Sequence, residues 1–223
     1  MNSTAVPVRV KICCIMTPEE ARIAIAAGAD AVGLVAKMPS GPGPIEEALI
    51  EQIAHSVPPP IATFLLTSAT KAADIIAQHH RCKTSVIQMV DRIEGDEYAA
   101  LRDALPGIRL VQVIHVQGVE SIDEALCIAP QVDALLLDSG RPQLSVKELG
   151  GTGRVHDWQV SRCIRESSPV PVFLAGGLNP ANVREAVAAV QPFAVDVCSG
   201  VRSDGKLDEA KCRAFIAAAK ALP

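Results

Sequence analysis

Residues 172–180 read VFLAGGLNP, a short apolar run followed by two glycines and an Asn-Pro pair. The run at 172–174 is typical of a strand that is buried on both faces of a parallel sheet. Asn179 before Pro180 indicates a helix start, because Asn caps free N–H groups and Pro fits the first helical position. The stretch therefore predicts a strand, a glycine loop and a helix, in that order.

The same order recurs from one end of the chain to the other. Strands are predicted at residues 8–13, 31–35, 61–66, 85–89, 109–114, 134–137, 172–174 and 194–197. Helices are predicted at residues 18–27, 45–56, 69–79, 96–105, 122–128, 158–166, 180–190 and 208–221. Eight consecutive strand–helix units close a barrel. We therefore expect an α/β protein in which residues 1–223 form a single (β/α)8 barrel domain, the TIM-barrel fold.

The composition favours a large buried core and a small-molecule partner. The chain is 49% hydrophobic but only 3% aromatic, as expected where Ala, Val, Ile and Leu fill parallel strands and closely packed helices. The net charge of −4 is small and the basic residues are scattered, which argues against nucleic-acid and anionic-membrane binding. Residues 1–7 lack the basic and apolar regions of a signal peptide, so we expect a soluble cytoplasmic protein.

The seven cysteines have no metal-binding spacing, which predicts reduced thiols with neither a disulfide framework nor a metal site. Cys13 is the candidate exception, because it ends the first predicted strand and barrel enzymes place their catalytic groups at the C-terminal ends of strands. Asp138 ends the sixth strand, so the two residues form a candidate acid–base pair. Lys11 is the nearest cation in sequence that would lower the pKa of a thiol. The alternatives are a buried apolar cysteine and a loop-capping carboxylate.

Glycine-rich loops are expected on the same face of the barrel. They are GGTG at 150–153, Gly176 and Gly177 after the seventh strand, and Ser199 and Gly200 after the eighth. Barrel enzymes frequently bind phosphate after strands seven and eight, where backbone N–H groups and a helix N-terminus approach the anion. Plain turn formation is the alternative. We expect a phosphorylated sugar, or a derivative of one, as the ligand.

Motifs at these positions resemble the phosphoribosylanthranilate isomerase family, which performs an Amadori rearrangement in tryptophan biosynthesis. The motifs are VKIC at 10–13, GADAVG at 28–33, LLD at 136–138, GTG at 151–153, DW at 157–158, LAGGLNP at 174–180, VDV at 195–197 and SGV at 199–201. The resemblance implies an isomerase that acts on a small phosphorylated sugar amine without a metal or organic cofactor. Family members occur as monomers and as homodimers, and either state is expected here.

The resemblance also implies roles for individual residues. Asp138 would be the general acid that protonates the furanose ring oxygen and opens the ring to a Schiff base. Cys13 would be the general base that removes the proton from the sugar C2. Substrate and phosphate contacts are expected from Lys11, Gln88, Gly153, Gly176, Gly177, Asp196, Ser199 and Gly200.

Departures from the family pattern gather on the side of the pocket that would receive the aromatic amine. Cys14 stands where the family usually has Gly, and the loop at 39–44, PSGPGP, lacks the arginine that pairs with the anthranilate carboxylate. Val90 replaces a usual His, while Cys198 and Arg202 replace a usual Ser and Glu. A bidentate Arg–carboxylate contact is worth about 1.5–3 kcal/mol, so its loss would weaken recognition of that group.

These departures leave alternatives open. Lys37 and Arg92 are candidates to replace the missing arginine, and His115 either faces the pocket or is a polar loop residue. The leading hypothesis is an isomerase of N-(5-phosphoribosyl)anthranilate. The others are a paralogue that isomerises a phosphoribosylamine lacking the carboxylate, and a non-catalytic barrel that binds a phosphorylated ligand.

Overall fold

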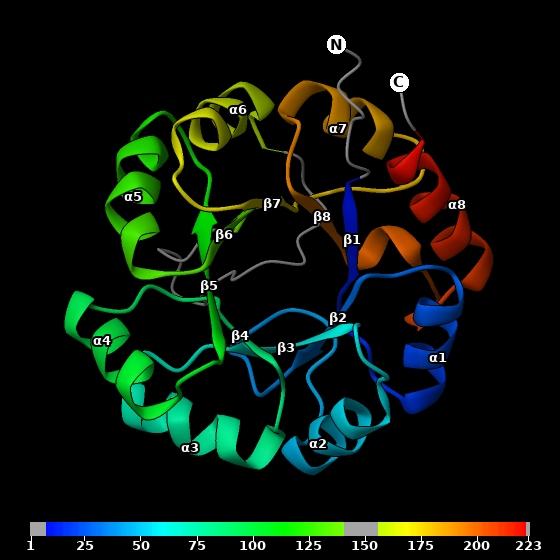
Figure 1. Ribbon diagram of the computed structural model, residues 1–223. Helices are drawn as coiled ribbons and strands as arrows, with labels where there is room; N and C mark the ends of the chain where they lie inside the picture. Colours follow the sequence, from blue (N-terminus) through cyan, green and yellow to red (C-terminus); the bar gives the residue numbers. More distant parts are fainter. Residues whose placement is uncertain (1–7, 141–155, 222–223) are drawn as a thin grey trace.

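Eight parallel strands follow one another around a closed barrel in chain order, and β8 pairs with β1 (Figure 1). This computed structural model describes residues 8–140 and 156–221. The strands are β1 Arg9–Ile12, β2 Ala31–Val35, β3 Ala62–Thr67, β4 Val86–Met89, β5 Arg109–His115, β6 Ala134–Asp138, β7 Val172–Leu174 and β8 Ala194–Val197. The predicted TIM barrel is confirmed, and each predicted strand end lies within one residue of the observed one.

One helix follows each strand and packs on the outside of the barrel, with α8 beside α1 (Figure 1). The helices are α1 Pro18–Ala26, α2 Glu47–Ser56, α3 Ala72–Cys82, α4 Gly95–Ala104, α5 Glu120–Ile128, α6 Trp158–Ser167, α7 Val183–Val190 and α8 Glu209–Lys220. None of the helices in the described part of the chain is long and apolar enough to cross a membrane.

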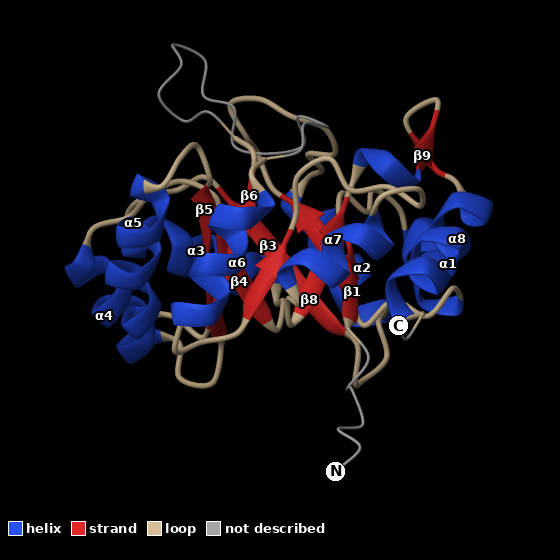
Figure 2. Ribbon diagram, turned by 90° about the horizontal axis from the view of Figure 1, so that it is seen from above, coloured by secondary structure: helices blue, strands red, loops and turns tan. Residues whose placement is uncertain are grey.

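Short elements that the sequence analysis missed precede β6 and follow β8. They are the 3₁₀ turns η1 Ala129–Gln131 and η2 Ser199–Val201, and the strands β9 Arg202–Ser203 and β10 Lys206–Leu207. The strands β9 and β10 pair as an antiparallel hairpin. Figure 2 shows β9 above the barrel on the side of α1 and α8.

The barrel closes at a seam between its first and last strands. Lys11 lies opposite Asp196 in the register of β1 with β8, and His115 lies opposite Asp138 in the register of β5 with β6. Because all eight strands are parallel, their C-terminal ends lie on one face of the barrel. Closure therefore brings side chains from both ends of the sequence to a common rim.

Apolar side chains fill two layers, one inside the barrel and one between the barrel and its helices. Inside the barrel, the rings of Phe64 and Phe173 meet edge to face with centroids 5.8 Å apart. Outside it, Ile75 of α3 and Phe215 of α8 are completely buried against the strands. Strands covered on both faces account for the nearly continuous apolar runs in the sequence.

The helix predicted to start at Pro180 starts three residues later, at Val183. The side chain of Asn179 does accept hydrogen bonds as a cap, from the N–H groups of Ala181 at 2.9 Å and Asn182 at 3.3 Å. Asn182 in turn donates its side-chain amide to the carbonyl of Gly177 at 3.0 Å. These contacts close a turn before the helix and fix the glycine loop that follows β7.

Two adjacent isoleucines of α3 test the packing of the helices on the barrel. Ile75 is completely buried, whereas Ile76 is only partly buried. Ile75→Ala is expected to lower the free energy of unfolding by about 2–5 kcal/mol, because it leaves a cavity, and Ile76→Ala by less than half as much. Thermal and urea unfolding followed by circular dichroism measure both. Equal losses would contradict this packing.

Candidate active site

A pocket opens at the C-terminal ends of the strands and contains about 700 Å³ of space, part of it open to solvent. Of the residues expected to form the site, it is lined by Cys13, Gln88, Asp138, Gly176, Gly177, Asp196 and Ser199. The structure thus brings the candidate acid, the candidate base and both described glycine loops to one cavity.

Cys13 follows β1 and is only 4% exposed, with its N–H donated to the Val197 carbonyl at 2.8 Å. A hydrogen bond from the Cys14 thiol lowers the pKa of Cys13, burial opposes this shift, and the Lys11 ammonium lowers the pKa further. The net pKa lies below the ordinary value for a thiol. A lowered pKa increases the fraction of thiolate, which is the form that can accept a proton.

The floor of the pocket holds an ion pair. Lys11 Nζ lies 2.9 Å from Asp196 Oδ1, and the lysine side chain is completely buried. Burial lowers the pKa of Lys11, but the negative charges of Asp196 and Cys13 outweigh it, and the net pKa is raised above its usual range. Burial raises the pKa of Asp196 against the effect of Lys11. The ammonium therefore persists beneath Cys13 as a fixed positive charge.

Asp138, the last residue of β6, lies on the same pocket at intermediate exposure. Its Oδ1 accepts a hydrogen bond from the N–H of Ser139 at 2.7 Å, which orients the carboxyl group. Gln88 of β4 is 3% exposed, and its Oε1 has no hydrogen-bond partner among the described residues. A buried polar atom on a pocket wall is ready for a ligand group, because leaving it unpaired costs about 1–3 kcal/mol.

The end of the pocket near β7 and β8 is formed by backbone. Gly176 and Gly177 have φ angles of 83° and 65°, in the left-handed region that favours glycine. A Cβ at Gly200 would lie 2.0 Å from the carbonyl oxygen of Leu178, so the loops after β7 and β8 touch at this point. Ser199 opens the turn η2, whose first N–H groups have no partner within the turn. This arrangement has the features of a barrel phosphate site.

Cys14, the residue in place of the usual Gly, has a φ of 61°. A left-handed conformation explains why glycine is favoured here, since a side chain costs about 1–2 kcal/mol. The Cys14 side chain packs closely against Gly43, where an added Cβ would lie only 2.6 Å from the Cys14 Cβ. The glycine in the PSGPGP loop therefore makes room for the cysteine.

The same loop forms a wall of the pocket, as its length indicated, although no individual residue of it was predicted to line the site. Met38, Ser40 and Pro42 line the pocket, together with Val90 of the β4–α4 loop. The wall is largely apolar and suits the flat face of an aromatic group.

Other expected residues lie elsewhere. Lys37 and Arg92 are exposed, and neither is among the described residues that line the pocket. His115 Nε2 lies 2.9 Å from the carbonyl oxygen of Val90 and also lies outside that lining. Gly153 and the rest of the GGTG loop lie outside the described residues.

Comparison with known proteins identifies the family. The family model described as N-(5'phosphoribosyl)anthranilate (PRA) isomerase matches residues 10–218. The chain belongs to this family. It is 38% identical over 217 residues to an N-(5'-phosphoribosyl)anthranilate isomerase of Haloarcula marismortui, across 96% of this chain and 97% of that relative.

Solved structures of this family share the fold. Phosphoribosyl anthranilate isomerase from Thermotoga maritima has a TM-score of 0.80 at 30% identity and is covered over 100% of its length by 96% of this chain. A further phosphoribosyl anthranilate isomerase, solved in complex with reduced 1-(o-carboxyphenylamino)-1-deoxyribulose 5-phosphate, has a TM-score of 0.78 at 28% identity. The same shares of the two chains are covered, 96% and 100%.

A substitution at Gly200 tests whether the loops after β7 and β8 form the predicted phosphate site. We expect Gly200→Ala to weaken binding of inorganic phosphate by about tenfold or more, because the new Cβ would displace the Leu178 carbonyl and misplace the N–H groups. Isothermal titration calorimetry measures the dissociation constant. Gly95→Ala is the control, since its Cβ would meet only Gln131 Oε1 at 3.4 Å. Unchanged phosphate affinity in Gly200→Ala would refute the assignment.

Proposed function

We propose that the chain isomerises N-(5'-phosphoribosyl)anthranilate in tryptophan biosynthesis, with Asp138 as the general acid and Cys13 as the general base. The observation that carries this proposal is that both residues line one pocket that also reaches the glycine loops after β7 and β8. Family membership supplies the substrate class and reaction. The cavity supplies an arrangement of groups suited to that reaction.

The reaction is a sequence of proton transfers. Asp138 donates its proton to the furanose ring oxygen as the bond from that oxygen to C1 breaks, and the nitrogen lone pair forms a C1=N bond. The Cys13 thiolate then removes the proton from C2. The C2–H electron pair forms a C1=C2 bond while the C1=N pair returns to nitrogen, which gives an enolamine. The enolamine tautomerises to the 1-deoxyketose, and the balance of atoms and electrons requires no cofactor.

The surrounding residues support these steps electrostatically. The Lys11 ammonium stabilises the Cys13 thiolate from below, and Asp196 keeps that ammonium in place at 2.9 Å. Gln88 is positioned to pair with a sugar hydroxyl through its free Oε1. Gly177 and Ser199 are placed to bind the phosphate through backbone N–H groups and so anchor the sugar between acid and base.

The apolar wall is the proposed site of the aromatic ring. Met38, Pro42 and Val90 line the pocket with apolar side chains. The bound compound in the related crystal structure carries a carboxyphenylamino group on a phosphorylated ribulose, and the two ends of this pocket suit those two parts. We place the enzyme in the cytoplasm, because its substrate is a small soluble metabolite. We propose that it is a monomer or a homodimer, since a solved relative is described as monomers made from a dimeric enzyme.

Substitution of the acid and the base tests the proposal. Cys13→Ala and Asp138→Asn are each expected to lower kcat/KM about 10²–10⁴-fold, the usual contribution of general acid–base catalysis. Turnover is followed by the fluorescence of phosphoribosylanthranilate generated in situ. Inorganic phosphate is expected to bind both variants normally, which provides a folding control. Retention of activity in Cys13→Ala would exclude the thiol as base.

The pH dependence gives a second test. Because the base acts as a thiolate, kcat/KM is expected to fall as the pH drops through the pKa of Cys13. That pKa is lowered by the Cys14 hydrogen bond and by Lys11, against the effect of burial. The acid limb of the profile should therefore lie below the ordinary range for a thiol, and Lys11→Met should move it to higher pH. A limb that Lys11→Met moves to lower pH would refute the electrostatic assignment.

A further inference from the structure

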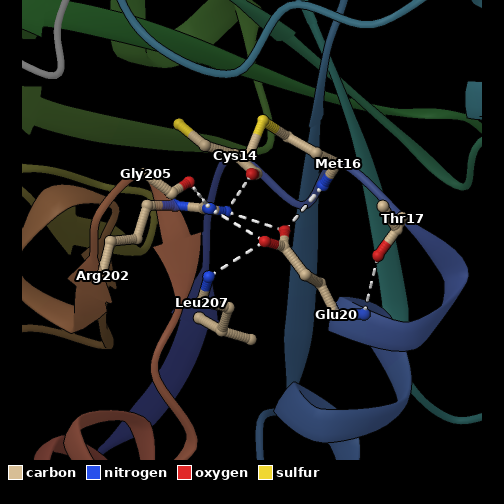
Figure 3. Close-up of polar contacts among 7 residues, drawn as sticks. All are labelled: Cys14, Met16, Thr17, Glu20, Arg202, Gly205 and Leu207. Carbon is tan, nitrogen blue, oxygen red and sulfur yellow. Dashed lines mark hydrogen bonds and ion pairs between the residues drawn. The ribbon is translucent and has the colours of Figure 1, made fainter.

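Arg202, whose role the sequence left open, reaches the backbone of the residue next to Cys13 (Figure 3). Its Nη2 donates to the carbonyl oxygen of Cys14 and lies 2.9 Å from Glu20 Oε2. Its Nη1 donates to Glu20 Oε1 at 3.0 Å and to the carbonyl of Gly205 at 2.9 Å. The two side chains are only 8% and 10% exposed, so this is a nearly buried ion pair.

Glu20 is held on both of its oxygens. Besides Arg202, it accepts hydrogen bonds from the N–H of Met16 at 2.9 Å and from the N–H of Leu207 at 2.9 Å. Burial raises the pKa of Glu20, but Arg202 and these two N–H groups outweigh it and lower the net pKa. A buried carboxylate with this many partners is fixed in one geometry. Glu20 therefore fixes the guanidinium that contacts Cys14.

The contact falls on a strained peptide. Cys14 has a φ of 61°, which a side chain rarely adopts, and its side chain is confined by Gly43. The neighbouring Cys13 and Cys198 thiols raise the pKa of Cys14, and Cys14 in turn lowers the pKa of Cys13. If the Cys14 carbonyl lost its donor, the peptide would be free to relax, and the thiol would move with it.

We infer that Arg202, held by Glu20, is a positioning residue for catalysis: it fixes the peptide that directly follows Cys13, and so the placement of the Cys13 and Cys14 thiols in the pocket. The inference rests on the proposed role of Cys13 as the base. Arg202 also follows directly on the turn η2, so the same guanidinium ties the phosphate end of the pocket to the loop that carries the base.

The groups that act on Cys13 make the inference testable. Cys13 faces Lys11 from β1, Asp196 from β8 and the thiol of Cys14, and Asp138 from β6 shares its pocket. A change at Arg202 leaves Lys11, Asp196 and Asp138 in place. An Arg202 substitution can then change the pKa of Cys13 in two ways: by displacing Cys14, or by removing one positive charge.

The experiment compares Arg202→Met with Arg202→Lys, which retains the charge but lacks the planar fork that contacts Cys14 and Glu20 together. Arg102→Met is the matched control, because Arg102 also pairs with a carboxylate, Asp133 at 2.6 Å, and with a backbone carbonyl, that of Gln131 at 3.4 Å. Each protein is assayed for kcat, KM and the pH profile of kcat/KM. Thiolate absorbance in the ultraviolet, minus that of the same protein with Cys13→Ala, titrates Cys13 without reference to activity.

We expect Arg202→Met to raise the pKa of Cys13 by about one pH unit, because the Cys14 thiol that lowers this pKa is no longer held in place. The Cys13 titration and the acid limb of the profile, where kcat/KM falls with decreasing pH, should both move upward by this amount. Below the limb, kcat/KM should fall about tenfold, with KM changed less than about threefold. Arg202→Lys should retain most of the shift. Arg102→Met should leave the Cys13 titration, the pH profile of kcat/KM and kcat as they are in the parent protein.

A second variant covers the case in which Arg202→Met does not fold. Cys14→Gly removes the thiol donor and relieves the backbone strain, so it should reproduce the upward shift, and adding Arg202→Lys to it should shift the limb no further. An unshifted Cys13 titration in Arg202→Lys and Cys14→Gly would overturn the inference, as would restoration of the parent limb by Arg202→Lys. If instead Cys13→Ala stays active, the proposed role of Cys13 as the base fails, while the thiol titration still tests whether Arg202 acts on Cys13.

Discussion

The buried ion pair of Lys11 and Asp196 is the constraint on which the site depends. It joins the first and last strands at the seam of the barrel, with Nζ and Oδ1 2.9 Å apart. Removing one partner of such a pair usually costs about 3–5 kcal/mol, because the other charge is left buried and unpaired. The ion pair that joins β1 to β8 therefore also places a positive charge beneath Cys13.

A second ion pair supports the thiol from outside the barrel. Arg202 and Glu20 fix the backbone after Cys13, while Lys11 and Asp196 lie beneath it. A glycine at position 14 would satisfy the left-handed turn without strain but would offer no thiol donor. This chain instead carries a cysteine there, with Gly43 shaped to receive it. The strained backbone of Cys14, its contact with Gly43 and the Arg202–Glu20 ion pair thus all adjoin Cys13, the proposed base.

Local pattern predicted the barrel well, because strands buried on both faces leave apolar runs and the loops between them are rich in Gly and Pro. Cys13 and Asp138 were predicted as candidate catalytic residues from their positions at strand ends, and the structure places both in one pocket. The link from Arg202 to Glu20 was not predictable, since the two residues are 182 positions apart and the replacement of a usual Glu by Arg202 did not indicate its partner. The start of α7 was misplaced because the Asn179–Asn182 side-chain contacts form a turn that resembles a helix start.

A crystal structure with a reduced product analogue bound would show whether Cys13 and Asp138 act on one sugar that is anchored by the glycine loops. We expect the phosphate on the N–H groups near Gly177 and Ser199, the sugar C2 within about 3.5 Å of Cys13 Sγ, and the oxygen released from the ring within hydrogen-bond distance of Asp138. A sugar bound in the pocket with C2 turned away from Cys13, or a phosphate bound elsewhere, would contradict this expectation.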